Sequence, residues 1–168
     1  MNQRPAIIEG NITPIYSTKG QMTVSAYSIS LDSVKAPEFI DITDRVISAV
    51  REANITMGAA TVYSRHTTAA IKINEWEPLL LEDLEHLLEH IAPKNGTYRH
   101  DDFEVRTVNM NPDESPNGHS HCQHLTLGSS ESIPIIGGEL QLGTYQRIFF
   151  IELDCPRPRD AIIQIMGV

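Results

Sequence analysis

The stretch Gln146-Arg147-Ile148-Phe149-Phe150-Ile151-Glu152-Leu153 decides the fold, because a short run this rich in isoleucine and phenylalanine is typical of a buried strand. Shorter strand-like runs surround it in the last third of the chain. They are His121–Leu127, Ile133–Ile136, Glu139–Leu142 after a Gly137-Gly138 turn, and Asp160–Met166. These runs predict a sheet that is largely antiparallel, since strands this close in sequence are joined most simply by short turns.

Upstream of these strands, two segments have the spacing of helices. Asp41 is placed as an N-cap, and apolar residues then recur at helical spacing until Asn54. Pro78 opens a clearer helix with a leucine stripe, which ends at Ile91 before Pro93. Two main helices and many strands predict an α+β fold with a mixed, largely antiparallel sheet, and 168 residues favour one domain, 1–168.

The remaining segments add strands and one irregular region. Ile55–Ser64 and Thr68–Ile73 are predicted strands on either side of a polar break at Arg65-His66-Thr67, and Asn11–Thr18 with Gln21–Leu31 predicts a hairpin. Lys94–Pro116 is predicted to be a loop with one short strand around Phe103 and Val105.

Composition excludes several classes of function. The formal net charge is −9, with 22 acidic and 13 basic residues, so the protein as a whole does not attract nucleic acid. No apolar run approaches the length of a membrane span or a signal peptide. The two cysteines form no Cys-x-x-Cys pair, and Cys122 has the character of a small buried residue, so we expect a soluble protein of the reducing cytoplasm.

The stretch with the most side chains that can bind a metal or transfer a proton is Asn117-Gly118-His119-Ser120-His121-Cys122-Gln123-His124. If it is extended, His119 and His121 share one face and begin a site for a divalent metal such as zinc, iron or nickel. Such a site needs three or four ligands. The candidate partners are His66, His100, Glu75, Asp101 and Glu114. His66 is favoured on local grounds because Arg65 and Thr67 beside it suit an anion.

Two glycine corners resemble phosphate-binding turns. Ser129 follows Leu127-Gly128, and Gly143-Thr144-Tyr145-Gln146 follows Leu142, so backbone N–H groups there can face a phosphate. Tight turns without a ligand are the alternative interpretation.

From His66 onward, an ordered series of motifs resembles the YjbQ-like family, whose assigned activity is secondary thiamine-phosphate synthase. The series is His66-Thr67-Thr68-Ala69-Ala70, Ile73-Asn74-Glu75, Asp83-Leu84-Glu85, Asn95–Asp101, Pro116–His121, Leu127-Gly128 and Leu142–Gln146. The order of the motifs is more specific than any one of them, and they span about the last two thirds of the chain.

The resemblance implies a homotrimer with a cleft where His66, His100 and His121 meet, and it favours His121 over His119 as the essential histidine. It implies that a pyrimidine diphosphate and a thiazole phosphate are joined there, with release of pyrophosphate. The residues it assigns, with those of the local patterns, fall into three groups. They are catalytic His66, His121, Glu75 and Asp101; substrate-binding Arg65, Thr67, Asn74, Ser129, Gly143, Thr144 and Gln146; and metal-binding His66, His100, His119 and His121.

Three alternatives stay open at the level of sequence. One is a metal-dependent hydrolase in which Glu75 or Asp101 is the base for a metal-bound water. Another is a noncatalytic trimeric module that binds a metal or an anionic metabolite. In the third, the histidines tie the Lys94–Pro116 loop to the sheet without chemistry.

Overall fold

The computed structural model describes residues 18–168. The elements in chain order are β1 (Thr23–Asp32), β2 (Glu38–Asp41), α1 (Thr43–Ala53), β3 (Met57–Ser64), β4 (Ala69–Glu75), α2 (Pro78–Ile91), the 3-10 turn η1 (Arg99–Asp101), α3 (Gly118–Leu127), β5 (Ser130–Ile136), β6 (Glu139–Leu140), β7 (Gln146–Glu152) and β8 (Pro158–Gly167). The α+β prediction is confirmed. The predicted strand Asn11–Thr18 lies outside the described residues apart from Thr18, so its pairing is not part of the fold described.

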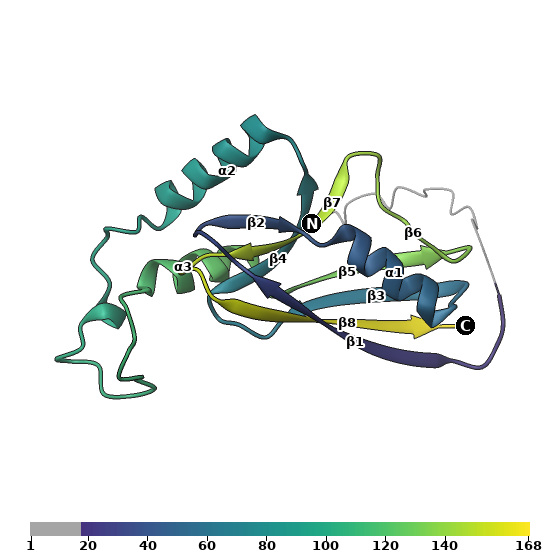
Figure 1. Cartoon of the computed structure of the whole chain (residues 1–168), viewed down its shortest axis with the longest axis horizontal. Coiled ribbons are helices and arrows are strands. Elements are labelled where there is room, and N and C mark those ends of the chain that lie inside the picture. Colours follow the sequence, from purple (N-terminus) through teal and green to yellow (C-terminus); the bar gives the residue numbers. More distant parts are fainter. Residues whose placement is uncertain (1–17) are drawn as a thin grey trace, which may run out of the picture.

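The strands form two antiparallel sheets (Figure 1). The larger has the order β1-β8-β3-β5-β6 and the smaller the order β2-β7-β4. β8 lies between β1 and β3, with Thr23 opposite Gly167 on one side and Gly58 opposite Gly167 on the other. The sequence predicted a mixed sheet, and every pairing among the described strands is antiparallel.

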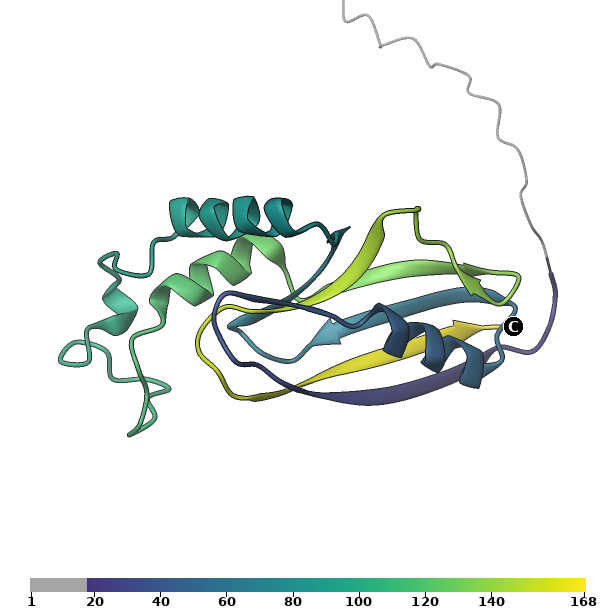
Figure 2. The same cartoon turned by 45° about the horizontal axis from the view of Figure 1, so that its top comes forward.

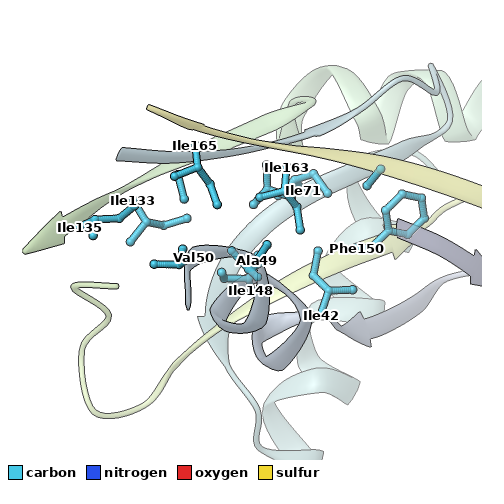
Figure 3. Packing of buried hydrophobic residues seen from close by; sticks show 14 of the residues in the cluster. Ile42, Ala49, Val50, Ile71, Ile133, Ile135, Ile148, Phe150, Ile163 and Ile165 are labelled. Carbon is cyan, nitrogen blue, oxygen red and sulfur yellow. The ribbon is translucent and has the colours of Figure 1, made fainter. Parts of the chain in front are cut away.

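The main core fills the space between the two sheets and α1 (Figure 3). Val46, Ala49 and Val50 of α1 face isoleucines of both sheets, including Ile163 and Ile148. The helix begins at Thr43 with Ile42 as its N-cap, so the N-cap predicted at Asp41 is one residue too early, although Asp41 Oδ1 accepts a hydrogen bond from the Thr43 backbone N–H at 2.9 Å. The helix ends at left-handed Asn54, as predicted. These buried side chains fix the position of the smaller sheet against the larger one.

A second core lies on the opposite face of the smaller sheet. The side chains of β7 alternate, so Ile148 and Phe150 enter the main core while Phe149 and Ile151 meet Leu88 of α2. Helices α2 and α3 lie side by side over this face (Figure 2), joined by hydrogen bonds from Gln123 Nε2 to the carbonyls of Leu88 and Ala92. The strand β7 thus contributes side chains to both cores.

Three sequence-based predictions in this region are wrong. His121–Leu127 is the C-terminal part of α3 rather than a strand, so His119 and His121 do not share a strand face. No strand forms around Phe103 and Val105; η1 at Arg99–Asp101 is the only regular element between α2 and α3. Cys122 is exposed on α3 rather than buried.

None of the helices within residues 18–168 has the length and apolar character that a membrane span requires.

Candidate functional site

One large polar cavity of about 990 Å³ lies where the connections around the two sheets meet the loop before α3. Its walls come from four separate parts of the chain. They are Arg65–Thr68 between β3 and β4, His100 of η1 with Arg106 beyond it, most residues from Asn109 to Asn117 together with His121 of α3, and Asp154, Cys155, Arg157 and Arg159 from the end of β7 to the start of β8. The structure therefore brings His66, His100 and His121 to one cavity, as the resemblance implies.

His66 is held by the start of β8. The backbone N–H of Asp160 donates to His66 Nε2 at 3.2 Å, so this nitrogen is the acceptor and the proton of the neutral ring lies on Nδ1. Burial and the nearby Arg159 guanidinium lower the pKa of His66. The ring is therefore neutral near pH 7.

His100 and His121 lie edge to face, with ring centroids 4.6 Å apart. Arg106 Nη1 lies 3.1 Å from His100 Nε2, and because a guanidinium can only donate, Nε2 is the acceptor there. Burial, and then the adjacent His100, lower the pKa of His121. Within residues 18–168, no group hydrogen-bonds the His121 ring, and its nitrogens are not sealed from solvent. His121 is therefore the histidine best placed to bind a ligand.

The start of α3 is fixed to η1 by Asp101. One carboxylate oxygen, Oδ1, accepts from the backbone N–H groups of Asn117 at 2.9 Å and Gly118 at 2.8 Å. Gly118 has no room for a side chain, since an added Cβ would lie 2.5 Å from Tyr98 Cβ. These contacts set the direction of α3 and hence the place of His121. Asp101, predicted as a base, positions the helix in this arrangement and does not line the cavity.

His119 points away from the large cavity. It is 4% exposed, lies 6.5 Å from the Tyr98 ring centre, and lines a smaller cavity on the other side of α3. Helical geometry explains this, because residues two apart differ by about 200° around a helix rather than sharing a face. The predicted pairing of His119 with His121 on one face does not occur.

Four arginines line the large cavity, and each is paired with a carboxylate. Arg65 binds Asp160, Arg106 binds Glu114, Arg157 binds Asp154, and buried Arg159 binds Glu152. Arg106 uses its remaining donors on the carbonyls of His100, Val108 and Asn109, and the hydrogen bond from Arg106 lowers the pKa of Glu114. In Arg65, Arg157 and Arg159, by contrast, Nη1 donates to no group in the described part of the chain. Three guanidinium groups therefore keep N–H donors for an anionic ligand.

The predicted metal-ligand set does not assemble within this chain. Across residues 18–168, no three His, Cys, Asp or Glu side chains lie close enough to hold an ion. The Nε2 lone pairs of His66 and His100 are occupied by Asp160 N–H and Arg106, and His119 faces elsewhere. A metal would have to displace Arg106 from His100. The donors as arranged do not fit a three-histidine ion, and metal binding stays a prediction.

Other predicted site residues lie at the far end of the smaller sheet. Asn74 and Glu75 end β4, where Glu75 is opposite Gln146, and Gln146 Oε1 accepts from the Gly143 N–H at 2.7 Å next to Thr144. The six steps of β4 separate Glu75 from the cavity by about 20 Å. Ser129 lies elsewhere again, beside His124, with its hydroxyl 3.1 Å from His124 Nε2. Within one chain these residues do not meet His66, His100 or His121, whereas Arg65 and Thr67 line the same cavity as those histidines.

Sequence reasoning missed the cavity residues of the Asp154–Arg159 segment, and it missed Arg106 and the full role of Asn117. Asn117 Oδ1 is buried without a hydrogen-bond partner among residues 18–168, and the residue lines the cavity. The signal for the first group was the Arg157-Pro158-Arg159-Asp160 run, in which two arginines flank a proline at the start of a strand. The role of Arg106 depends on the conformation of an irregular loop, which no local pattern specifies.

The fold and the cavity together define an α+β domain with a histidine- and arginine-lined polar site. The chain belongs to the family described as UPF0047 protein YjbQ-like, which matches residues 27–168. The resemblance noted from the motifs is thereby confirmed at the level of the family.

Similar proteins extend over nearly the whole described chain. A UPF0047 protein of Methanothermobacter thermautotrophicus is 38% identical over 146 residues, covering 87% of this chain and 94% of its own. The Bacillus subtilis protein YugU is 34% identical, with 83% and 98% covered. Among solved structures, a YbjQ-like protein of unknown function from Sulfolobus solfataricus has a TM-score of 0.79 at 30% identity, covering 88% of this chain and all of its own. These similarities extend to the fold and leave the activity open.

Proposed function

We propose that the large cavity binds the phosphate groups of a small molecule and is the catalytic site of a transferase of the thiamine-phosphate synthase type. The observation that carries this proposal is the meeting of three histidines and three arginines with uncommitted Nη1 donors in one cavity of about 990 Å³. A cavity of this size accommodates two small ring compounds side by side.

The electrostatics of the cavity support an anionic ligand despite the net charge of −9. The carboxylates that pair with Arg65, Arg157 and Arg159 hold each guanidinium in place and accept hydrogen bonds from the N–H donors on one side of it. The opposite side of a guanidinium can still form charge-assisted hydrogen bonds to phosphate oxygens. Arg159 is 8% exposed, so its position costs little to organise when a ligand binds.

The proposed reaction requires positioning and charge stabilisation more than covalent catalysis. The carbon–oxygen bond to the diphosphate of the pyrimidine compound breaks, and the oxygen keeps the electron pair as pyrophosphate leaves. The thiazole nitrogen supplies the pair for the new carbon–nitrogen bond. The arginines neutralise the leaving pyrophosphate, and the Nδ1–H of neutral His66 can donate to one of its oxygens. His121, whose ring is uncommitted, contacts the second substrate.

The test is thiamine phosphate formation by full-length protein carrying His66→Ala or His121→Ala, with exposed His90→Ala on α2 as the control. We expect each cavity variant to lose at least about tenfold in turnover, while His90→Ala matches the parent. Unchanged turnover in both cavity variants would remove the histidines from the mechanism.

Two further measurements on the same protein separate the alternative functions. Release of phosphate from a phosphate ester in the absence of the thiazole partner would indicate a hydrolase instead. Binding of pyrophosphate without any product, across a panel of phosphate esters, would indicate a noncatalytic module.

We further propose that the protein assembles as a homotrimer, as the family resemblance implies. Supporting this, Trp76, Leu79 and Tyr145 are 49%, 68% and 70% exposed at the end of the smaller sheet that carries Asn74, Glu75 and Gly143. An exposed apolar patch of this kind is typical of a protein contact. A second copy seated there would give the far motif residues a neighbour that the single chain does not supply.

A further inference from the structure

Arg106 holds together the irregular segment between η1 and α3, which forms one wall of the large cavity and lies at one end of the molecule (Figure 2). Its side chain is 12% exposed, and all three of its nitrogen atoms donate to acceptors nearby. These acceptors are the carbonyls of His100, Val108 and Asn109, both carboxylate oxygens of Glu114, and the ring of His100. By contrast, the large apolar side chains of the segment are exposed, namely Phe103, Val105, Val108 and Met110. One guanidinium therefore holds this wall in place of an apolar core.

Arg106 also fixes both the backbone and the ring of His100. Its Nη1 donates to the His100 carbonyl at 3.2 Å and to the ring nitrogen Nε2 at 3.1 Å. A guanidinium has donors only, so Nε2 carries a lone pair and the proton of the neutral ring lies on Nδ1. This contact therefore selects one of the two tautomers of His100.

Glu114 favours the opposite tautomer. Its Oε1 lies 3.7 Å from His100 Nε2, beyond hydrogen-bond distance, and accepts from Arg106 Nη1 at 2.7 Å instead. The hydrogen bond from Arg106 lowers the pKa of Glu114, so the carboxylate is ionised and can only accept. Without the guanidinium, this carboxylate would attract a proton on His100 Nε2. The tautomer of His100 therefore depends on Arg106.

The orientation of His100 in turn affects His121. The two ring centroids are 4.6 Å apart and the ring planes meet at 67°. Among residues 18–168 no hydrogen bond holds the His121 ring, whereas the contacts of Arg106 hold His100 at two atoms. The position of the His121 ring is therefore set by the α3 backbone and by packing against His100.

We propose that Arg106 is a positioning residue of the large cavity, which holds His100 as the Nδ1–H tautomer against His121 and so places His121 for the second substrate. The effect of Arg106 on turnover rests on the proposed transferase function. Its effect on the His100 ring is independent of any reaction, so the two effects are tested separately.

The first test is the tautomer of His100 in full-length protein labelled with nitrogen-15 at histidine. Long-range proton–nitrogen NMR at about pH 8.5, where imidazole rings are neutral, distinguishes the two forms. We expect Nδ1–H in the parent and Nε2–H in Arg106→Met, and a His100→Gln variant assigns the signals. Arg99→Met is the matched control, because Arg99 is exposed beside His100 and does not line the cavity. This control should keep Nδ1–H.

A second variant covers the case in which Arg106→Met fails to fold because Glu114 is left unpaired. Arg106→Met combined with Glu114→Met removes both charges, which proteins tolerate better than the loss of one partner. His100 should then lose its fixed Nδ1–H form, since neither group selects a tautomer. Nε2–H in the parent, or an Nδ1–H form that persists in the Arg106 variants, would overturn the proposal.

The second test is turnover in combination with the His121 variant. We expect Arg106→Met to lower the rate of thiamine phosphate formation about tenfold. If Arg106 acts through His121, the same change in the His121→Ala protein should cost no further turnover, because residues that act together are not additive. Additive losses would show that Arg106 acts independently of His121 and would overturn its positioning role. If the parent forms no thiamine phosphate, the proposed function fails, and the tautomer of His100 alone decides whether Arg106 positions this ring.

Discussion

Arg65 is the most accessible of the three arginines that keep a donor for an anion, because its side chain is 56% exposed at the mouth of the large cavity. We expect Arg65→Gln to weaken pyrophosphate binding about tenfold, since one charge-assisted hydrogen bond is lost. Calorimetric titration measures this directly. Arg51→Gln, at the exposed end of α1, is the control and should bind as the parent does. Equal affinities for the two variants would remove Arg65 from the anion site.

His119 links stability to pH. Burial is the largest cause that lowers its pKa, and Lys94 adds to it, while Asp154, Asp101 and Glu89 oppose the shift. Because the folded pKa lies below the ordinary value of about 6.5, the unfolded chain binds this proton more readily. The contribution to stability is full above about pH 6.5 and is lost as the pH falls toward the folded pKa.

We therefore expect the melting temperature of the parent to fall more than that of His119→Gln between about pH 7.5 and about pH 5.5. The same change at exposed His90 serves as the control and should leave the parent's pH dependence in place. Parallel curves for the parent and His119→Gln would contradict the assigned cause.

At the scale of elements, the start of α3 is the junction on which the cavity depends. Gly118→Ala would place a Cβ 2.5 Å from Tyr98 Cβ, a contact that requires η1 and α3 to move apart. We expect a loss of about 1–3 kcal/mol in the free energy of unfolding, measured by urea denaturation. Gly143→Ala is the matched control, because a Cβ added at Gly143 would lie 3.4 Å from its nearest neighbour, Oε1 of the flexible Gln146 side chain. A loss at Gly118 no larger than at Gly143 would show that the junction yields.

The same helix shows what local sequence patterns can and cannot predict. β7 and α2 were predicted closely, because alternation along β7 and the leucine stripe of α2 reflect burial that the sequence itself encodes. α3 has no such stripe. Its buried residues are Gly118, His119, Ser120 and Gln123, and their hydrogen-bond partners lie on η1, on α2 and at Leu153 just after β7. Its helical state follows from those distant contacts, which a local pattern does not contain.

The candidate site was predictable to a similar degree. His66, His100 and His121 were brought together correctly through the order of the motifs. The position of His119 depended on the helical state of α3, and the orientation of Arg106 on an irregular loop, so both required the folded structure. The motif residues near Gly143 lie close to Asn74 and far from the cavity histidines. The spacing of the motifs along the sequence does not reveal which motifs meet in space and which do not.

At the scale of the whole molecule, the two ends of the smaller sheet have different character. β4 begins at Ala69, directly after the cavity residue Thr68, and ends at Glu75, next to the exposed patch of Trp76, Leu79 and Tyr145. Trp76 stacks on Phe149 with ring centroids 5.7 Å apart, so one face of its ring is already covered by the second core. The remaining apolar area is the part of the patch that a second copy of the chain would cover.

The proposed trimer predicts a change of mass on disruption of this patch. The parent should sediment at about three times the 18.7 kDa of one chain, and a double variant, Leu79→Glu with Tyr145→Glu, should sediment as a monomer because two carboxylates would be buried without partners. Val34→Glu with Val108→Glu, at two exposed valines outside the patch, introduces the same charge and should remain trimeric. A monomeric parent would contradict the trimer itself, whereas a trimeric double variant would place the contact elsewhere on the surface.

If the trimer dissociates and thiamine phosphate formation is lost with it, the residues at the far end of β4 act on the cavity of a neighbouring subunit. Full activity in the monomer would instead confine the reaction to the cavity of one chain.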